Sequence, residues 1–307
     1  MQINKKEWRR PATNGEGEIF SRLWAPEAPK AVLMIAHGMA EHSARYDAFA
    51  TWLAQQGWAV CMNDHAGHGR SAIVKGHFAD ENGWECVLGD LHALLGEVSG
   101  MFPGLPLFLM GHSMGSFLAR SYVARWGESL TAAIFCGTMG ENPALGFARL
   151  LANLQIKLKG PKSPGRLIDK LSTGSYYKKI KNPVNKSAWL STDEANCVAY
   201  EADPDCGFVF TAAGYRDLFA GLTEVNGPAW PGRVPKDLPI FVVAGEEDPV
   251  GNYGKGPTQV AEKLRAAGVR DVTLKLYPGK RHELLNETNK AEVYADLRDW
   301  LDAKLPG

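Results

Sequence analysis

The sequence lacks several features, and each absence excludes a class of protein. No apolar run approaches the length of about 18 residues that a membrane-spanning helix needs, so no such helix is expected. Neither sign of charge is in excess, since 34 Lys and Arg residues balance 34 Asp and Glu residues, which argues against a nucleic-acid partner. Repeats and low-complexity tracts are absent. What remains is a chain of 307 residues, 45 % hydrophobic, with the composition of an ordinary globular protein.

Cysteine is also scarce, with five residues and no CxxC pair. An odd number cannot form a complete disulfide framework, and the low density predicts reduced, mostly buried thiols. No group of Cys and His residues has the spacing of a zinc site, so no metal site is expected. The N-terminal segment carries charge without the apolar core of a signal peptide, and the expected location is therefore cytoplasmic.

Short apolar runs alternate with segments of helical spacing along much of the chain. Expected strands cover residues 31–36, 58–62, 106–110, 132–136, 240–244 and 272–277. Expected helices cover residues 43–56, 87–98, 116–126, 258–267 and 288–305. This alternation predicts an α/β fold with a mostly parallel central sheet flanked by helices.

The alternation stops near Thr138 and returns at Ile240, an interval too long for a simple loop. Residues 140–228 are predicted to form an inserted, mainly helical cap over the edge of the sheet where ligands bind. The core would then consist of residues 1–139 and 229–307. Basic side chains dominate the first half of the insertion: Arg149, Lys157, Lys159, Lys162, Arg166, Lys170, Lys178, Lys179, Lys181 and Lys186. They fit either a solvated face or a surface attracted to an anionic lipid or substrate, with transient membrane contact.

The motif that carries chemistry is Gly111-His112-Ser113-Met114-Gly115, which has the form G-x-S-x-G. Alone it is a weak signal, but an apolar strand runs into it and an amphipathic helix leaves it. That strand–turn–helix context is what a nucleophile elbow requires, and the small glycines permit the tight turn. Ser113 is therefore the candidate nucleophile.

A serine hydroxyl needs a base, an orienting acid and donors for the oxyanion. His282 is the only histidine beyond Ser113, and it follows the last expected strand. Asp248 follows the expected strand 240–244 and is the preferred acid, ahead of its neighbours Glu246 and Glu247. The backbone amides of Met114 and Met39 are the candidate oxyanion donors, although both residues also suit a packing role.

Three stretches together resemble the monoacylglycerol lipase and lysophospholipase group of α/β-hydrolases. They are His37-Gly38-Met39-Ala40-Glu41-His42-Ser43-Ala44-Arg45-Tyr46, Asp64-His65-Ala66-Gly67-His68-Gly69-Arg70-Ser71, and Phe102-Pro103-Gly104-Leu105-Pro106 running on to the elbow. The resemblance implies the α/β-hydrolase fold. It also implies that Glu41 and Arg45 form a polar pair beside the leaving alcohol. A carboxylate at a helix start and a surface arginine would explain the same two residues.

Other residues carry weaker signals. His65 and His68 are expected to shape their glycine-rich loop by packing and hydrogen bonding rather than to bind a metal. Cys206 lies near an aromatic stretch of the insertion, where it would either line an acyl pocket or be a buried, inert thiol.

These observations predict a serine carboxylic ester hydrolase that acts through an acyl-enzyme, without a cofactor or metal. Its expected substrates are monoacylglycerols or similar short- to medium-chain esters. Three alternatives stay open: a proline-releasing aminopeptidase, an acyltransferase, and a non-catalytic binding protein of the same fold. The sequence leaves the oligomeric state undecided.

Overall fold

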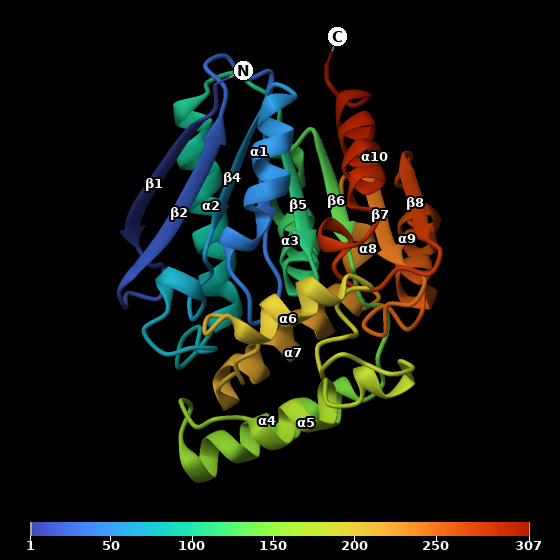
Figure 1. Cartoon of the computed structure of the whole chain (residues 1–307). Coiled ribbons are helices and arrows are strands. Elements are labelled where there is room, and N and C mark those ends of the chain that lie inside the picture. Colours follow the sequence, from blue (N-terminus) through green and yellow to red (C-terminus); the bar gives the residue numbers. More distant parts are fainter. Residues whose placement is uncertain (1, 307) are drawn as a thin grey trace.

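The computed structural model describes residues 2–306, and its central feature is an eight-stranded sheet (Figure 1). The strands lie in the order β1-β2-β4-β3-β5-β6-β7-β8. They are β1 (Asn4–Pro11), β2 (Glu18–Ala25), β3 (Ala31–Ala36), β4 (Trp58–Asn63), β5 (Leu107–His112), β6 (Ala132–Cys136), β7 (Ile240–Gly245) and β8 (Val272–Tyr277). All neighbours from β4 through β8 pair in parallel, while β1 and β2 are antiparallel.

Helices cover both faces of this sheet, which explains why the inner strands are continuous apolar runs. Every residue of β3, β4, β6 and β7 is buried. The flanking helices are α1 (Asp47–Gln55), α2 (Gly83–Met101), α3 (Met114–Trp126), α9 (Lys255–Ala266) and α10 (Lys290–Asp302). The expected α/β architecture and all the expected strands are confirmed, and the helices differ from expectation only near their ends.

The N-terminal hairpin of β1 and β2 is the part of the sheet that the sequence did not predict. Nearly all of β1 is exposed, and its charged side chains give no pattern of burial. Strands of this kind protect a sheet edge by presenting charge to solvent, so their composition resembles that of a loop.

Between β6 and β7 the chain forms a layer of helices beyond the carboxyl ends of the strands (Figure 1). We call residues 137–239 the β6–β7 segment. Its helices are α4 (Leu145–Lys159), α5 (Arg166–Ser172), α6 (Glu194–Ala202), α7 (Ala212–Asn226) and α8 (Trp230–Arg233). α7 packs on α2 and α3, whereas α4 packs on α7 and lies farther out.

A fully buried arginine joins the core to both ends of this segment. Arg120 of α3 donates hydrogen bonds to the carbonyls of Met139 at 2.8 Å and Val225 at 2.5 Å. Its guanidinium also lies 4.4 Å from the ring centroid of Trp230. These contacts fix the two ends of the segment to a helix that starts at Ser113, although the boundaries 140 and 228 stay a prediction.

Most of the large apolar side chains of α4 do not point into the core. Leu151 packs against the core, but Phe147, Leu150, Leu154 and Leu158 are exposed. The thiols behave as expected from their low number: Cys61, Cys136, Cys197 and Cys206 are buried, and Cys86 is half-buried.

Candidate active site

Ser113 lies at a sharp turn between β5 and α3, with φ of 53° and ψ of −121°. L-residues rarely adopt this conformation, and it costs on the order of 1–3 kcal/mol. The turn is held because the Ser113 amide donates to the Cys136 carbonyl at 2.9 Å, and the Ser116 hydroxyl donates to the Ser113 carbonyl at 2.6 Å. A strained, well-supported serine at this point is the geometry of a nucleophile elbow.

Close backbone approach explains the two glycines of the motif. A Cβ at Gly111 would lie 2.0 Å from the Gly115 carbonyl oxygen, and one at Gly115 would lie 2.0 Å from the Ala36 carbonyl oxygen. Neither space admits even a methyl group, so the motif is a steric requirement of packing the elbow on β3.

Asp248 and His282 come together from the loops that follow β7 and β8. The imidazole Nδ1 lies 2.8 Å from the Asp248 Oδ2, and both residues are buried. Asp248 also accepts from the Val250 amide at 2.8 Å, which fixes the orientation of the carboxylate. Because the carboxylate accepts a hydrogen bond at Nδ1, it leaves Nε2 as the nitrogen available for a proton from a nucleophile.

Buried charges determine the proton affinity of His282. Burial disfavours the charged imidazolium, but the charge and hydrogen bond of Asp248, aided by Glu283 and Glu41, raise the pKa of His282 above its ordinary value. By contrast, burial and the nearby His282 lower the pKa of His112 to about 4. The two rings lie 4.7 Å apart between centroids, and the pKa values of His282 and His112 are shifted in opposite directions.

Ser113 and His282 line one cavity of about 760 Å³, which lies under the β6–β7 segment. The cavity is also lined by Met39, Met114, Glu41 and Cys206. Asp248 and Arg45 are not part of its lining. Among residues 2–306 no direct hydrogen bond joins the Ser113 hydroxyl to the imidazole. Catalytic hydrogen bonds of this kind commonly shorten only when substrate binds. The volume falls in the range typical of small-molecule sites.

The loop after β3 passes directly over the nucleophile. A Cβ at Gly38 would lie 3.1 Å from the Ser113 Cβ. In the part of the chain that the structure describes, the amides of Met39 and Met114 donate to no protein group. Each of these two N–H groups is therefore free to donate a hydrogen bond at the cavity wall, as an oxyanion site requires.

A buried ion network lies behind this loop. The Arg45 guanidinium donates to Glu41 at 2.8 Å and to both oxygens of Glu283, at 2.5 and 2.7 Å. The amide nitrogen of Asn196 also donates to Glu283, at 2.7 Å. Two carboxylates thus share one guanidinium and leave a net negative charge beside the imidazole. Burial disfavours the ionised form of Glu283, but Arg45 and Asn196 outweigh it and lower its pKa.

Sequence reasoning missed Glu283, Asn196 and Tyr200. Glu283 directly follows His282, but nothing in the sequence indicates that its carboxylate reaches Arg45. The hydroxyl of Tyr200 donates to the Ala40 carbonyl at 2.9 Å, and Ala40 has a φ of 52°. α6, which carries Asn196 and Tyr200, therefore supports both the ion network and the strained loop after β3.

Neutral histidines accept hydrogen bonds from backbone amides of the loop after β3 and of the loop after β4. The Ala40 amide donates to His68 Nε2 at 3.2 Å, and the His65 amide donates to His37 Nε2 at 3.0 Å. Burial lowers the pKa of all three rings, which keeps them uncharged. The hydrogen bonds of His68 agree with its expected role in shaping this loop, whereas the His65 ring packs against His37 and has no hydrogen-bond partner among residues 2–306.

Comparisons with known proteins place the chain in a family. The family model described as "Serine aminopeptidase, S33" matches residues 27–289. The chain belongs to this family. Among its relatives is a monoacylglycerol lipase of Mycolicibacterium smegmatis, 30% identical, with 95% of each chain covered. The human monoglyceride lipase is 29% identical, with 95% of this chain and 89% of the human one covered.

Solved structures of other proteins have the same fold. A thermostable carboxyl esterase from Bacillus coagulans superimposes with a TM-score of 0.92 at 29% identity, covering 98% of this chain and 99% of that one. The monoglyceride lipase of Saccharomyces cerevisiae superimposes with a TM-score of 0.74 at 20% identity, covering 95% and 93%. The α/β-hydrolase fold and the expected resemblance to monoacylglycerol lipases are confirmed.

Proposed function

We propose that this chain is a serine carboxylic ester hydrolase in which Ser113, His282 and Asp248 form the catalytic triad. The observation that carries the proposal is a strained serine in the same cavity wall as an imidazole hydrogen-bonded to a buried aspartate. The class of reaction also agrees with the relatives, which include lipases and an esterase.

Each residue has a stated role in the proposed reaction. Ser113 attacks the ester carbonyl while His282 takes its proton, and Asp248 stabilises the imidazolium. The amides of Met39 and Met114 receive the oxyanion. His282 then protonates the leaving alcohol, and water hydrolyses the acyl-enzyme in the same way.

Monoacylglycerols and similar medium-chain esters are the proposed substrates. Aromatic and aliphatic side chains line much of the cavity, including Phe117, Phe208, Phe219 and Leu222. Glu41 and Glu283 also line it, so the cavity has polar as well as apolar surface. An ester with one apolar tail and one polar alcohol fits both surfaces.

The aminopeptidase in the family's description is the competing function. A free α-amine needs an unpaired carboxylate, but Glu41 accepts from the Gly38 amide, the Tyr46 hydroxyl and Arg45. Glu283 is occupied by Arg45 and Asn196. These pairings favour the ester, and hydrolysis of aminoacyl anilides faster than of glycerol esters would reverse that preference.

We further propose that α4 and α5 contact a lipid surface. Exposed Leu150, Leu154, Leu158, Leu167 and Leu171 lie among exposed Lys and Arg side chains. These helices form the outer edge of the molecule beyond α6 and α7, at the bottom of the view in Figure 1. An apolar stripe flanked by basic residues suits an interface with anionic lipid. Among residues 2–306 no helix has the length and apolarity to cross a bilayer.

Replacing the nucleophile tests the central proposal. Ser113→Ala should reduce the hydrolysis of nitrophenyl and glycerol esters by at least about a thousandfold while the fold is retained. A fluorophosphonate should label Ser113 in the parent protein and leave the variant unlabelled. Unchanged turnover in folded Ser113→Ala, or labelling at another serine, would reject Ser113 as nucleophile.

A further inference from the structure

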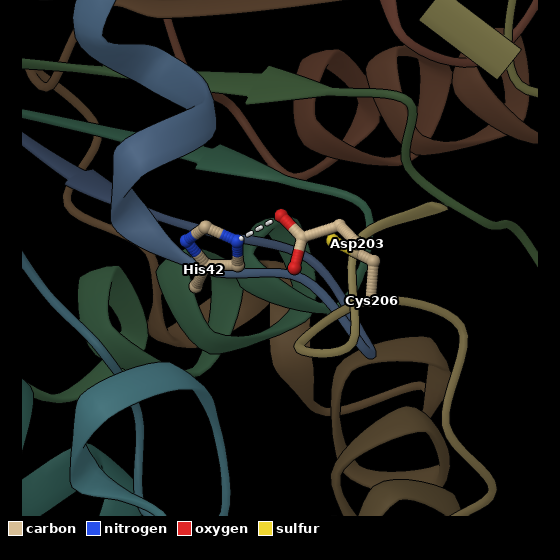
Figure 2. A group of neighbouring side chains, drawn as sticks. All are labelled: His42, Asp203 and Cys206. Atoms are coloured by element: carbon tan, nitrogen blue, oxygen red, sulfur yellow. Dashed lines mark hydrogen bonds and ion pairs between the residues drawn. The ribbon is translucent and has the colours of Figure 1, made fainter. Parts of the chain in front are cut away.

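Three side chains with metal-binding atoms meet beside the cavity, outside the proposed triad (Figure 2). His42 begins the helical turn after Glu41, while Asp203 and Cys206 lie in the turn that follows α6. The imidazole Nε2 lies 2.9 Å from the Asp203 Oδ2. One donor atom from each of the three residues lies within 4.8 Å of the other two.

This set of donors suits a particular class of ion. Imidazole nitrogen, carboxylate oxygen and thiolate sulfur are the three ligand types of zinc. Bonds of about 2.0–2.3 Å in tetrahedral geometry separate ligand atoms by roughly 3.5 Å. Small side-chain rotations therefore bring the three donors onto one ion, leaving a fourth position for water.

The residues around the three side chains leave a path for an ion, and the ligands can balance its charge. The side chain of Asp203 is 32 % exposed, while Cys206 is buried in the cavity wall. A dication bound by a carboxylate and a thiolate has no net charge, and Arg45 nearby is already paired with two carboxylates. Burial raises the pKa of the Cys206 thiol, but metal coordination displaces such a proton to solvent.

Hydrogen bonds already orient the ligands. The Asp205 amide donates to the Asp203 Oδ1 at 2.8 Å, which leaves Oδ2 directed at His42. Bonds of this type fix a ligand before the ion arrives. The Gly207 amide, next to Cys206, donates to the Ala40 carbonyl at 2.9 Å, so the turn after α6 and the loop after β3 are already joined there.

We propose that His42, Asp203 and Cys206 form a binding site for one zinc-class divalent ion, which joins the loop after β3 to the turn after α6. The proposed site contains none of Ser113, His282 and Asp248, so ion binding can be tested separately from ester hydrolysis. Its occupation would stabilise the loop that carries the Met39 amide.

Calorimetric titration with ZnCl₂ tests the site on the full chain after treatment with EDTA. We expect one ion per chain, with affinity weakened at least tenfold in His42→Ala and in Cys206→Ser. Asp205→Asn, which changes a neighbouring carboxylate that pairs with Lys75, should bind zinc as the parent does. Ser113→Ala should also bind normally, which separates this result from the fate of the proposed function.

Cobalt supplies a readout that surface binding does not imitate. Co²⁺ in the site should give a thiolate-to-cobalt charge-transfer band, lost in Cys206→Ser and retained in Cys86→Ser. Each variant is first melted in EDTA, and Asp203→Asn replaces any variant that fails to fold. The proposal is overturned if the parent binds no zinc saturably, or if folded variants of the three ligands bind zinc as tightly as the parent.

Discussion

At the scale of single residues, the site combines a strained backbone with buried charge. Ser113 adopts a left-handed conformation that only hydrogen bonds and packing maintain. His282 sits between Asp248 and a network with an excess of negative charge. The strain raises the energy of Ser113, and the buried negative charge raises the proton affinity of His282. The proposed reaction uses both residues.

The strain at Ser113 predicts that a glycine there stabilises the protein. Ser113→Gly should be about 1 kcal/mol more stable than Ser113→Ala, because glycine adopts positive φ without steric cost. Urea denaturation of the two inactive variants measures the difference. Equal stabilities would mean that the backbone at this turn is not strained.

The ion network predicts the acid limb of the pH–rate profile. The base must be neutral, so kcat/KM should fall as pH drops through a pKa above the ordinary 6.5 of histidine. Glu283→Gln removes a negative charge that favours the imidazolium, and the midpoint should move to lower pH. The pH profile of nitrophenyl ester hydrolysis provides this midpoint.

The matched control for Glu283 is Glu287→Gln. Glu287 is buried in the same loop and accepts from the amides of Arg281 and Thr192, each at 2.9 Å, but it does not contact Arg45. Its substitution should leave the midpoint in place. A shift of equal size in both variants would indicate a change in loop structure rather than in charge.

At the scale of secondary-structure elements, α6 supports the loop after β3. The Tyr200 hydroxyl donates to the carbonyl of Ala40, whose φ is positive. Tyr200→Phe should lower kcat about tenfold with little change in KM, because it removes one of the hydrogen bonds that hold the oxyanion loop, at a cost of about 1.4 kcal/mol. Tyr294→Phe is the control, since its hydroxyl also donates to a buried carbonyl, that of Leu285, outside this loop. A loss mainly in KM would place Tyr200 in substrate binding instead.

How far the sequence could predict these elements depends on the range of the contacts involved. Strands such as β3 and β7 were predictable because burial on both faces produces an uninterrupted apolar run. The contact between the side chains of Asp248 and His282 could be predicted because chain order in the fold restricts the candidates. Strand β1 was not, since its exposed side chains carry no periodic signal.

Contacts between segments that are far apart in the chain could not be predicted from sequence patterns. Arg45 and Glu283 are separated by 238 positions, and His42 and Asp203 by 161. Neither spacing belongs to a known motif, so only the folded structure brings these side chains together. For the same reason the sequence did not reveal that Leu150, Leu154 and Leu158 of α4 face solvent.

At the scale of the whole molecule, the outer edge formed by α4 and α5 should determine binding to lipid. Leu150→Ser combined with Leu154→Ser removes two exposed apolar side chains, so partitioning onto phosphatidylserine vesicles should fall about tenfold or more. Sedimentation with vesicles gives the partition coefficient. Hydrolysis of a short soluble ester should stay unchanged, because these side chains lie outside the cavity wall.

Two further measurements decide whether the protein contacts lipid through α4 and α5. Val198→Ser removes an exposed apolar side chain of α6 and should leave vesicle binding intact. Raising the salt concentration should weaken the binding of the parent protein, because the lysines around the leucines contribute about 1 kcal/mol each near an anionic surface. If the leucine double variant binds vesicles as the parent does, the apolar stripe has another role, and lipid substrate reaches the cavity without docking through α4.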